Sequence, residues 1–251
     1  MARVAHRGGA GLAPENTLAA FSTGLSYGAD YLEMDVHLSK DGQLVVIHDA
    51  GLARTTDVSG DVADYTAAEL AAVDAAAKFF GEPVTGHQGV PTLDQVLALA
   101  KGRAGVQIEI KLRSDKSRYP GIEAKLVQTL WAREMLAESV VLSFDFPTLQ
   151  EIKRIEPGLK TCALISTAYM KGDGSAGPEA IAEQMLAIGA DAVGVNASLL
   201  KEPLLVALKA RGMGVGVWTV NDLASMHEFA DLGVDFITSD RPDLLQQAFG
   251  Q

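Results

Sequence analysis

The chain has 251 residues, of which 48% are hydrophobic and 21% charged, and its formal net charge is −11. This length is typical of one large domain, here residues 1–251, and the acidic balance argues against general binding to nucleic acids, which requires a basic surface. No apolar run approaches the roughly 18 residues of a membrane span, and the N-terminus lacks the apolar segment of a signal peptide. With a single cysteine, Cys162, these features predict a cytoplasmic protein without an internal disulfide.

Short β-rich runs alternate with amphipathic helical runs along almost the whole chain. This alternation predicts parallel strands joined by crossover helices. The expected strands are residues 3–7, 31–36, 44–49, 106–111, 140–144, 161–165, 191–196, 214–220 and 235–240. The expected helices include residues 17–28, 93–101, 121–134, 148–156, 179–189, 203–212 and 222–233.

The second and third of these strands are expected to form a hairpin. The linker between them, "HLSKDGQ", is too short for a parallel crossover, which needs a dozen or more residues, and it contains the turn signal Asp41-Gly42. A turn centred on these two residues predicts that Asp35 lies opposite His48. The remaining eight strands predict an α/β protein with a (β/α)8, or TIM, barrel, and the run 44–49 is then a flap over its mouth.

Residues 50 to about 91 interrupt the alternation as a short insertion after the second strand. Residues 65–80 are expected to be helical, and residues 81–93 form a loop rich in glycine and proline. The insertion is either a small subdomain or, more simply, a long connection between strand and helix. Its apolar helix face could pair two copies, which leaves a monomer and a homodimer both open.

Charged side chains stand near the carboxyl ends of the predicted strands, where TIM barrels place their active sites. Glu33 and Asp35 are two residues apart and share one face of a strand, as do Glu109 and Lys111. Three carboxylates at one barrel mouth are costly to bury unless a cation compensates them. Glu33, Asp35 and Glu109 therefore predict one divalent cation bound through oxygen, Mg²⁺ or Ca²⁺. For any one residue taken alone, a buried ion pair such as Glu109 with Lys111 is the alternative.

Two histidines and two basic residues accompany these carboxylates. His6 and Arg7 end the first strand, and His48 lies in the hairpin. An imidazole titrates near neutrality, so His6 and His48 can serve as general acid and general base. The carboxylates outnumber Arg7 and Lys111 by one, so the mouth repels phosphate until a dication reverses its charge. Arg7 and Lys111 could then stabilise charge that develops at phosphorus. After the first strand, Asn16 is expected to cap the first helix.

A set of short motifs, taken together and in order, resembles the glycerophosphodiester phosphodiesterase family over nearly the full chain. The motifs are "HRGG", "PENT", "EMDVHLSKDG", "VVIHD" followed by "RTT", "PTL", "IEIK", "SFD", "VWTVN" and "ITSDRPDLL". No single motif is specific, but the ordered set is. The resemblance implies a metal-dependent hydrolase that converts glycerophosphodiesters, its small-molecule partners, into glycerol 3-phosphate and an alcohol.

The family's pattern also implies roles for nine positions of this chain. The implied metal ligands are Glu33, Asp35 and Glu109, and the implied acid–base pair is His6 and His48. The implied substrate-binding residues are Arg7 and Lys111 at the phosphate, Trp218 near the glycerol, and Glu15. Glu15 belongs to the motif "PENT" and either contacts the substrate or orients the first strand.

Two other functions use the same residues. In a phosphorus–oxygen lyase, a hydroxyl of the substrate attacks phosphorus and a cyclic phosphate is released. In a non-catalytic barrel that binds metal or phosphate, one of the histidines or carboxylates would be missing, and all are present.

Overall fold

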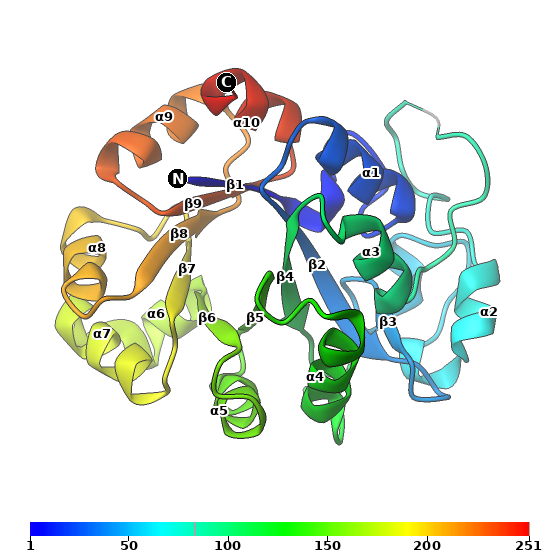
Figure 1. The fold of residues 1–251 in the computed structure, drawn as a ribbon, viewed down its shortest axis with the longest axis horizontal. Helices are drawn as coiled ribbons and strands as arrows, with labels where there is room; N and C mark the ends of the chain where they lie inside the picture. The colour runs from blue at the N-terminus through cyan, green and yellow to red at the C-terminus, as the bar shows by residue number, and fades with distance from the viewer. Residues whose placement is uncertain (83, 251) are drawn as a thin grey trace.

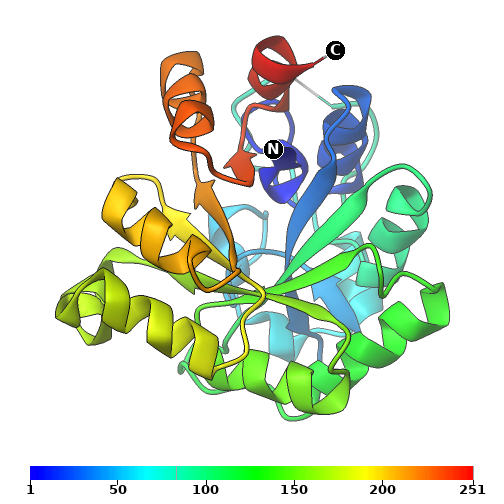
Figure 2. The same cartoon turned by 60° about the vertical axis from the view of Figure 1, so that its left-hand side comes forward.

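Eight parallel strands close into a barrel with helices around it (Figures 1 and 2). The computed structural model describes residues 1–82 and 84–250; Pro83, within the predicted loop 81–93, and Gln251 lie outside the described residues. The strands follow one another around the ring in the order β1, β9, β8, β7, β6, β5, β4, β2, and β2 also pairs with β1. The predicted (β/α)8 barrel is therefore confirmed.

The strands and helices follow the predicted alternation. The strands are β1 (Ala2–Ala5), β2 (Tyr31–Leu38), β3 (Leu44–Val46), β4 (Gly105–Ile110), β5 (Ser139–Ser143), β6 (Lys160–Ile165), β7 (Ala192–Asn196), β8 (Gly214–Trp218) and β9 (Phe236–Ser239). The α-helices are α1 (Leu18–Ser26), α2 (Ala67–Ala72), α3 (Leu93–Ala100), α4 (Ile122–Arg133), α5 (Phe146–Ile155), α6 (Thr167–Lys171), α7 (Pro178–Ala187), α8 (Glu202–Lys209), α9 (Leu223–Leu232) and α10 (Pro242–Phe249). Neither α6 nor α10 was among the predicted helices. Within the described residues, we find no helix with the length and apolar character needed to cross a membrane.

The strand β3 pairs antiparallel with β2, as predicted, but in a different register. The amide of Ile47 donates to the carbonyl of Asp35 at 3.0 Å, so the predicted pairing of Asp35 with His48 is wrong by one residue. The turn holds three residues, 40–42, instead of two, and Gly42 takes a left-handed conformation with φ of 72°. A loop of this length favours a left-handed glycine at its end, and the extra residue shifts the pairing.

The insertion at residues 50–91 packs around an apolar cluster separate from the main core. The cluster contains Val45, Ile47, Leu52, Val62, Leu70, Ala75 and Val90. The predicted helix over 65–80 is wrong in its extent, because α2 ends at Ala72. Beyond that point the amide of Ala75 donates to the carbonyl of Gln88 at 2.7 Å, so the backbone pairs across the insertion instead of along a helix.

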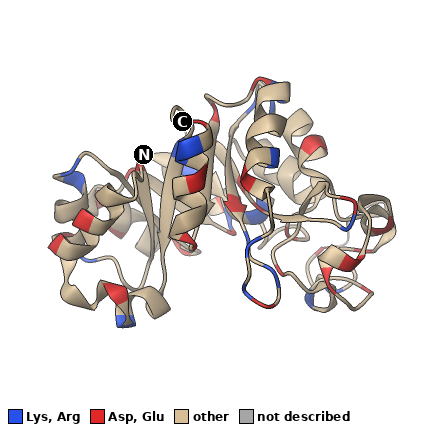
Figure 3. Cartoon of the chain, turned by 90° about the horizontal axis from the view of Figure 1, so that it is seen from below, with Lys and Arg blue, Asp and Glu red and all other residues tan. Residues whose placement is uncertain are grey.

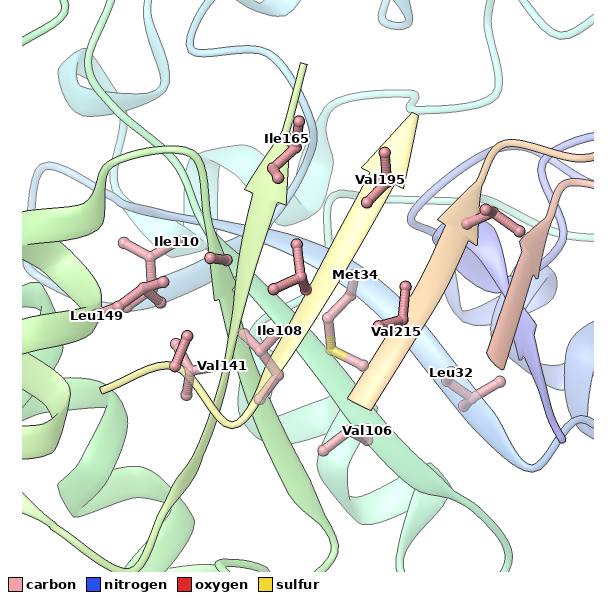
Figure 4. Close-up of a cluster of buried hydrophobic side chains, with 14 of the residues drawn as sticks. Leu32, Met34, Val106, Ile108, Ile110, Val141, Leu149, Ile165, Val195 and Val215 are labelled. Carbon is pink, nitrogen blue, oxygen red and sulfur yellow. The ribbon is translucent and has the colours of Figure 1, made fainter. Parts of the chain in front are cut away.

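Alternate side chains of β2 and β4 face opposite sides of the barrel wall. Leu32, Met34, Ile108 and Ile110 are buried in the large apolar cluster that also contains residues of the surrounding helices (Figure 4). The residues between them therefore face the barrel interior, since successive side chains of a strand alternate. This alternation directs the charged residues of both strands into the barrel.

The cap of the first helix lies one residue later than predicted. The hydroxyl of Thr17 accepts the amide of Ala20 at 3.2 Å, so Thr17 is the N-cap of α1. The prediction that Asn16 caps this helix is wrong. Asn16 has a φ of 59°, and its side chain reaches Asp35 in the barrel instead.

Gly216 in β8 stands where the barrel has no room for a side chain, since a Cβ there would lie 2.2 Å from the ring of Phe236. We predict that Gly216→Ala lowers the free energy of unfolding by roughly 1–3 kcal/mol, measured by urea denaturation, because the ring or the strand must move. Gly214→Ala is the matched control on the same face of β8. Its Cβ would lie 3.4 Å from the Cβ of Ala192, an ordinary contact. Equal losses in both variants would contradict the steric explanation.

Candidate active site

Three buried carboxylates meet inside the barrel on β2 and β4. Glu33, Asp35 and Glu109 are 3%, 1% and 8% exposed. One carboxylate oxygen from each lies within 4.8 Å of the other two. The register of the sheet explains the meeting, because Asp35 on β2 pairs directly with Glu109 on β4. The structure therefore brings together the three residues that the sequence assigned to a cation.

Basic and amide groups contact these carboxylates unevenly. Asp35 accepts from Asn16 Nδ2 at 2.8 Å and lies 3.5 Å from Arg7 Nε and 3.4 Å from Lys111 Nζ. Lys111 Nζ also donates to Glu109 Oε1 at 2.7 Å. Glu33 accepts the backbone amide of Arg7 at 2.9 Å. The cationic side chains thus compensate Asp35 best and Glu33 least. Figure 3 marks the acidic and basic positions along the chain, and both kinds occur near the centre of that view.

The pKa values follow this distribution. Burial alone would raise the pKa of Asp35, but Lys111 and Arg7 hold it below its usual range. Burial, together with the negative charge of Asp35, raises the pKa of Glu33 to about 7. Burial also raises the pKa of Glu109, although Lys111 opposes the rise. One negative charge therefore lacks compensation, and three carboxylates are compatible with a divalent cation that prefers oxygen ligands.

Each predicted catalytic histidine is oriented by a carboxylate. His6 Nδ1 donates to Asp240 Oδ1 at 2.6 Å, and His48 Nδ1 donates to Asp49 Oδ1 at 2.6 Å. In both rings the other nitrogen, Nε2, is not used by this hydrogen bond and can contact a ligand. Nε2 of His6 lies 3.9 Å from Glu33 Oε2. A carboxylate at Nδ1 fixes both the tautomer and the orientation of an imidazole.

The environments of the two histidines shift their pKa values in opposite directions. Burial lowers the pKa of His6, but the charge of Glu33 and the hydrogen bond to Asp240 outweigh it, so the pKa is raised. Burial lowers the pKa of His48, and Lys111 adds to this effect. With opposite shifts, one ring can be protonated while the other is neutral, an arrangement that acid–base chemistry can use.

A further set of polar residues contacts Asp240 and Asp49, the carboxylates that bind the two histidines. Asn221 Nδ2 donates to Asp240 Oδ2 at 2.7 Å. Arg54 donates to Asp49 and also to both oxygens of Glu15, at 2.7 and 2.9 Å. Glu15 accepts from Arg7 Nη1 at 2.9 Å as well. The carboxylate of Glu15 is thus held between two guanidinium groups and orients both.

Six of the nine predicted site residues line one cavity of about 160 Å³, namely His6, Arg7, Glu33, His48, Glu109 and Trp218. Its remaining wall is mainly apolar and includes Leu142, Phe144, Leu164 and Phe236. The indole of Trp218 donates to the carbonyl of Gly194 at 3.0 Å and meets the ring of Phe144 edge to face at 5.5 Å. The other three residues adjoin this cavity: Asp35 and Lys111 contact its ionic groups, and Glu15 lies behind Arg7.

Five residues that orient the site were not predicted to belong to it: Asn16, Asp49, Arg54, Asn221 and Asp240. Asp240 directly follows β9, so the rule that sites collect at strand ends could have found it. Arg54 and Asn221 lie in the motifs "RTT" and "VWTVN", but neither motif by itself indicates which carboxylate its polar residue contacts.

His37, on β2 of the hairpin, is also buried beside the site. His37 is 1% exposed. The hydroxyl of Tyr119 donates to His37 Nδ1 at 3.0 Å, and His37 Nε2 donates to the carbonyl of His48 at 3.1 Å.

The fold and the site together define a (β/α)8 barrel with two carboxylate-bound histidines and an acidic cluster near the carboxyl ends of its strands. The model of the Glycerophosphoryl diester phosphodiesterase family matches residues 6–244. The chain belongs to this family and is a phosphodiesterase.

Named relatives resemble the chain over almost their whole length. It is 36% identical over 242 residues to a glycerophosphodiester phosphodiesterase of Caldanaerobacter subterraneus subsp. tengcongensis, covering 96% of this chain and 95% of that protein. Among solved structures, a glycerophosphodiester phosphodiesterase from Agrobacterium tumefaciens matches with a TM-score of 0.82 at 31% identity, covering 98% and 99% of the two chains. An Oleispira antarctica phosphodiesterase, solved in complex with the product sn-glycerol-3-phosphate, matches with a TM-score of 0.82 at 26% identity, covering 100% and 97%.

The raised pKa of Glu33 makes the cation-free fold sensitive to pH. The unfolded glutamate ionises at lower pH, so the stabilisation from a protonated Glu33 is complete below the unfolded pKa and is lost as pH rises through about 7. We predict that Glu33→Gln raises the free energy of unfolding by roughly 1–3 kcal/mol at about pH 8.5, and by less towards about pH 5.

Chemical denaturation in EDTA measures this gain. Glu228→Gln, on the exposed surface of α9, is the matched control and should show no comparable dependence. A gain in Glu33→Gln that is the same at both pH values would contradict the assignment of the uncompensated charge to Glu33.

Proposed function

We propose that the chain hydrolyses glycerophosphodiesters to glycerol 3-phosphate and an alcohol, using two histidines and a divalent cation. The observation that carries this proposal is the smaller cavity, where two carboxylate-oriented imidazoles stand beside two of the three acidic side chains and one of the two basic ones. The remaining two, Asp35 and Lys111, contact these groups directly. The named activity of the relatives and the product bound to the Oleispira antarctica protein support the choice of substrate.

The buried acidic cluster is the site for the cation. Glu33, Asp35 and Glu109 would hold it through their carboxylate oxygens, and the raised pKa of Glu33 indicates a charge that the protein itself leaves uncompensated. Mg²⁺ or Ca²⁺, when bound, supplies positive charge that attracts the phosphate and polarises one of its non-bridging oxygens.

Two basic residues of the chain would bind the phosphate. Arg7 and Lys111 are mostly buried, with about one sixth of each side chain exposed, and both lie next to Asp35. Desolvated cations beside a reacting phosphate interact more strongly than solvated ones, because water screens them less. Arg7 and Lys111 therefore stabilise the charge that accumulates on the phosphate oxygens in the transition state.

The two histidines would move the protons. One imidazole takes the proton of the attacking water, and the other gives a proton to the oxygen of the leaving alcohol. Asp240 and Asp49 keep Nδ1 of each ring occupied, so Nε2 is the atom that exchanges the proton. Trp218 and the apolar wall of the small cavity would pack against the glycerol carbons and exclude water.

Dependence on a cation is the first test. Treatment of the purified protein with EDTA is expected to lower turnover of glycerophosphocholine by roughly 100-fold or more, with recovery on addition of Mg²⁺ or Ca²⁺. Phosphorus NMR should show glycerol 3-phosphate as the product. Turnover that ignores chelation would remove the cation from the mechanism, and a persistent cyclic phosphate would establish the lyase instead of the hydrolase.

The histidines provide the second test. His6→Ala and His48→Ala are each expected to lower kcat by about 10²–10⁴, the usual contribution of a general acid or base. His87→Ala is the matched control. His87 is exposed in the insertion, where its Nε2 donates a hydrogen bond to the carbonyl of Ala71. Near-normal kcat in either active-site variant would exclude that histidine from proton transfer.

A further inference from the structure

A second, larger cavity adjoins the site, and most of its wall has no role in the proposed mechanism. It measures about 550 Å³ and shares His48, Glu109 and Phe144 with the smaller cavity, whereas Trp218 lines only the smaller one. Its walls come mainly from residues 49–51 at the start of the insertion, residues 110–114 and 116 from the end of β4 onward, and residues 143–145 from the end of β5 onward. We call it the outer cavity. Its volume is within the usual range of cavities that hold a small-molecule ligand.

The loop after β4 is fixed over the outer cavity by contacts at both of its ends. Tyr119 is 3% exposed, and its hydroxyl is bound to His37. The guanidinium carbon of Arg113 lies 5.1 Å from the centre of the Tyr119 ring, a cation–π contact. Ser114 Oγ donates to Asp61 Oδ2 of the insertion at 2.6 Å. Arg113 therefore stands at a defined place on the cavity wall.

The acidic residues on the wall of the outer cavity are already compensated. Asp49 binds His48 and Arg54, and Glu109 binds Lys111. Asp145 caps α5 by accepting the amide of Thr148 at 3.0 Å, and it lies 3.5 Å from Arg118 Nε.

Two basic residues of the wall, by contrast, have no carboxylate within 4.0 Å among the described residues. These are Arg113 and Lys116, which a tight turn joins through the Lys116 amide and the Arg113 carbonyl. Asp115 between them is not part of the wall, and its carboxylate accepts the amide and hydroxyl of Ser117 at 2.9 and 2.6 Å. The outer cavity thus offers two positive charges to a ligand.

We propose that the outer cavity binds the alcohol half of the substrate and selects diesters whose alcohol carries a second negative charge, a phosphate or a carboxylate. This inference rests on the proposed function, which places the glycerol beside Trp218 in the smaller cavity. A quaternary ammonium head group is disfavoured, because it binds best against several aromatic faces. Phe144 is the one Phe, Tyr or Trp on the described wall of the outer cavity.

Three diesters with the same glycerol phosphate half test this selection. Their alcohols are anionic in bis(glycerophospho)glycerol, neutral in glycerophosphoglycerol and cationic in glycerophosphocholine. At low salt we expect kcat/KM, counted per reactive diester, to be roughly fivefold higher for the anionic than for the neutral alcohol, and lowest for the cationic one. The preference should shrink as salt is added, since salt screens exposed charges.

The double variant Arg113→Gln/Lys116→Gln is expected to bring the ratio of anionic to neutral substrate close to one. Arg103→Gln/Lys201→Gln removes the same charge from exposed positions that do not line the outer cavity, and it should keep the wild-type ratio. If the wild type hydrolyses none of the three diesters, the proposed function fails. If the wild type hydrolyses them without this preference, the proposed selection by the outer cavity is wrong. It is also wrong if the preference survives in Arg113→Gln/Lys116→Gln, or if Arg103→Gln/Lys201→Gln loses the preference to the same extent.

Discussion

The structure depends on the burial of three carboxylates beside only two cationic side chains inside the barrel. Asp35 is matched by Arg7, Lys111 and Asn16, whereas Glu33 receives one backbone amide and carries the raised pKa. A buried charge without a partner is among the most costly features a fold can carry. Protonation of Glu33 relieves the excess charge in the protein alone, and under the proposed function a divalent cation would relieve it instead.

The surrounding residues keep this cluster and its histidines in a fixed geometry. One chain of contacts runs from His48 through Asp49, Arg54 and Glu15 to Arg7, and so joins the hairpin to the first strand. A separate pair of contacts joins His6 to Asp240 and Asn221 at the other side of the ring closure. Each imidazole therefore has its own carboxylate and its own support. Such second contacts matter because a small displacement of a reacting group costs much of its catalytic effect.

The two cavities beside the cluster differ in the chemistry of their walls. The smaller one is largely apolar beyond its ionic groups and contains Trp218, whereas the outer one is bounded by the loop after β4, the start of the insertion and the loop after β5. Barrel strands supply most of the wall of the smaller cavity, and connecting loops supply most of the wall of the outer cavity. Under the proposed function this division is physically reasonable, because strands would fix the reacting groups while loops would vary the recognition of the leaving alcohol without disturbing them.

The sequence by itself determined the barrel and the inward direction of Glu33, Asp35 and Glu109, because strand–helix alternation and the two-residue period of strands are local properties. It did not determine the register of the hairpin, which depended on a turn of three residues, nor the extent of α2, whose backbone pairs with a distant loop. The pairing of His6 with Asp240 was equally out of reach, since the two residues are 234 positions apart and meet only where β1 and β9 close the ring. Local pattern fixes which face a side chain takes, but contacts between distant segments decide which charges compensate one another.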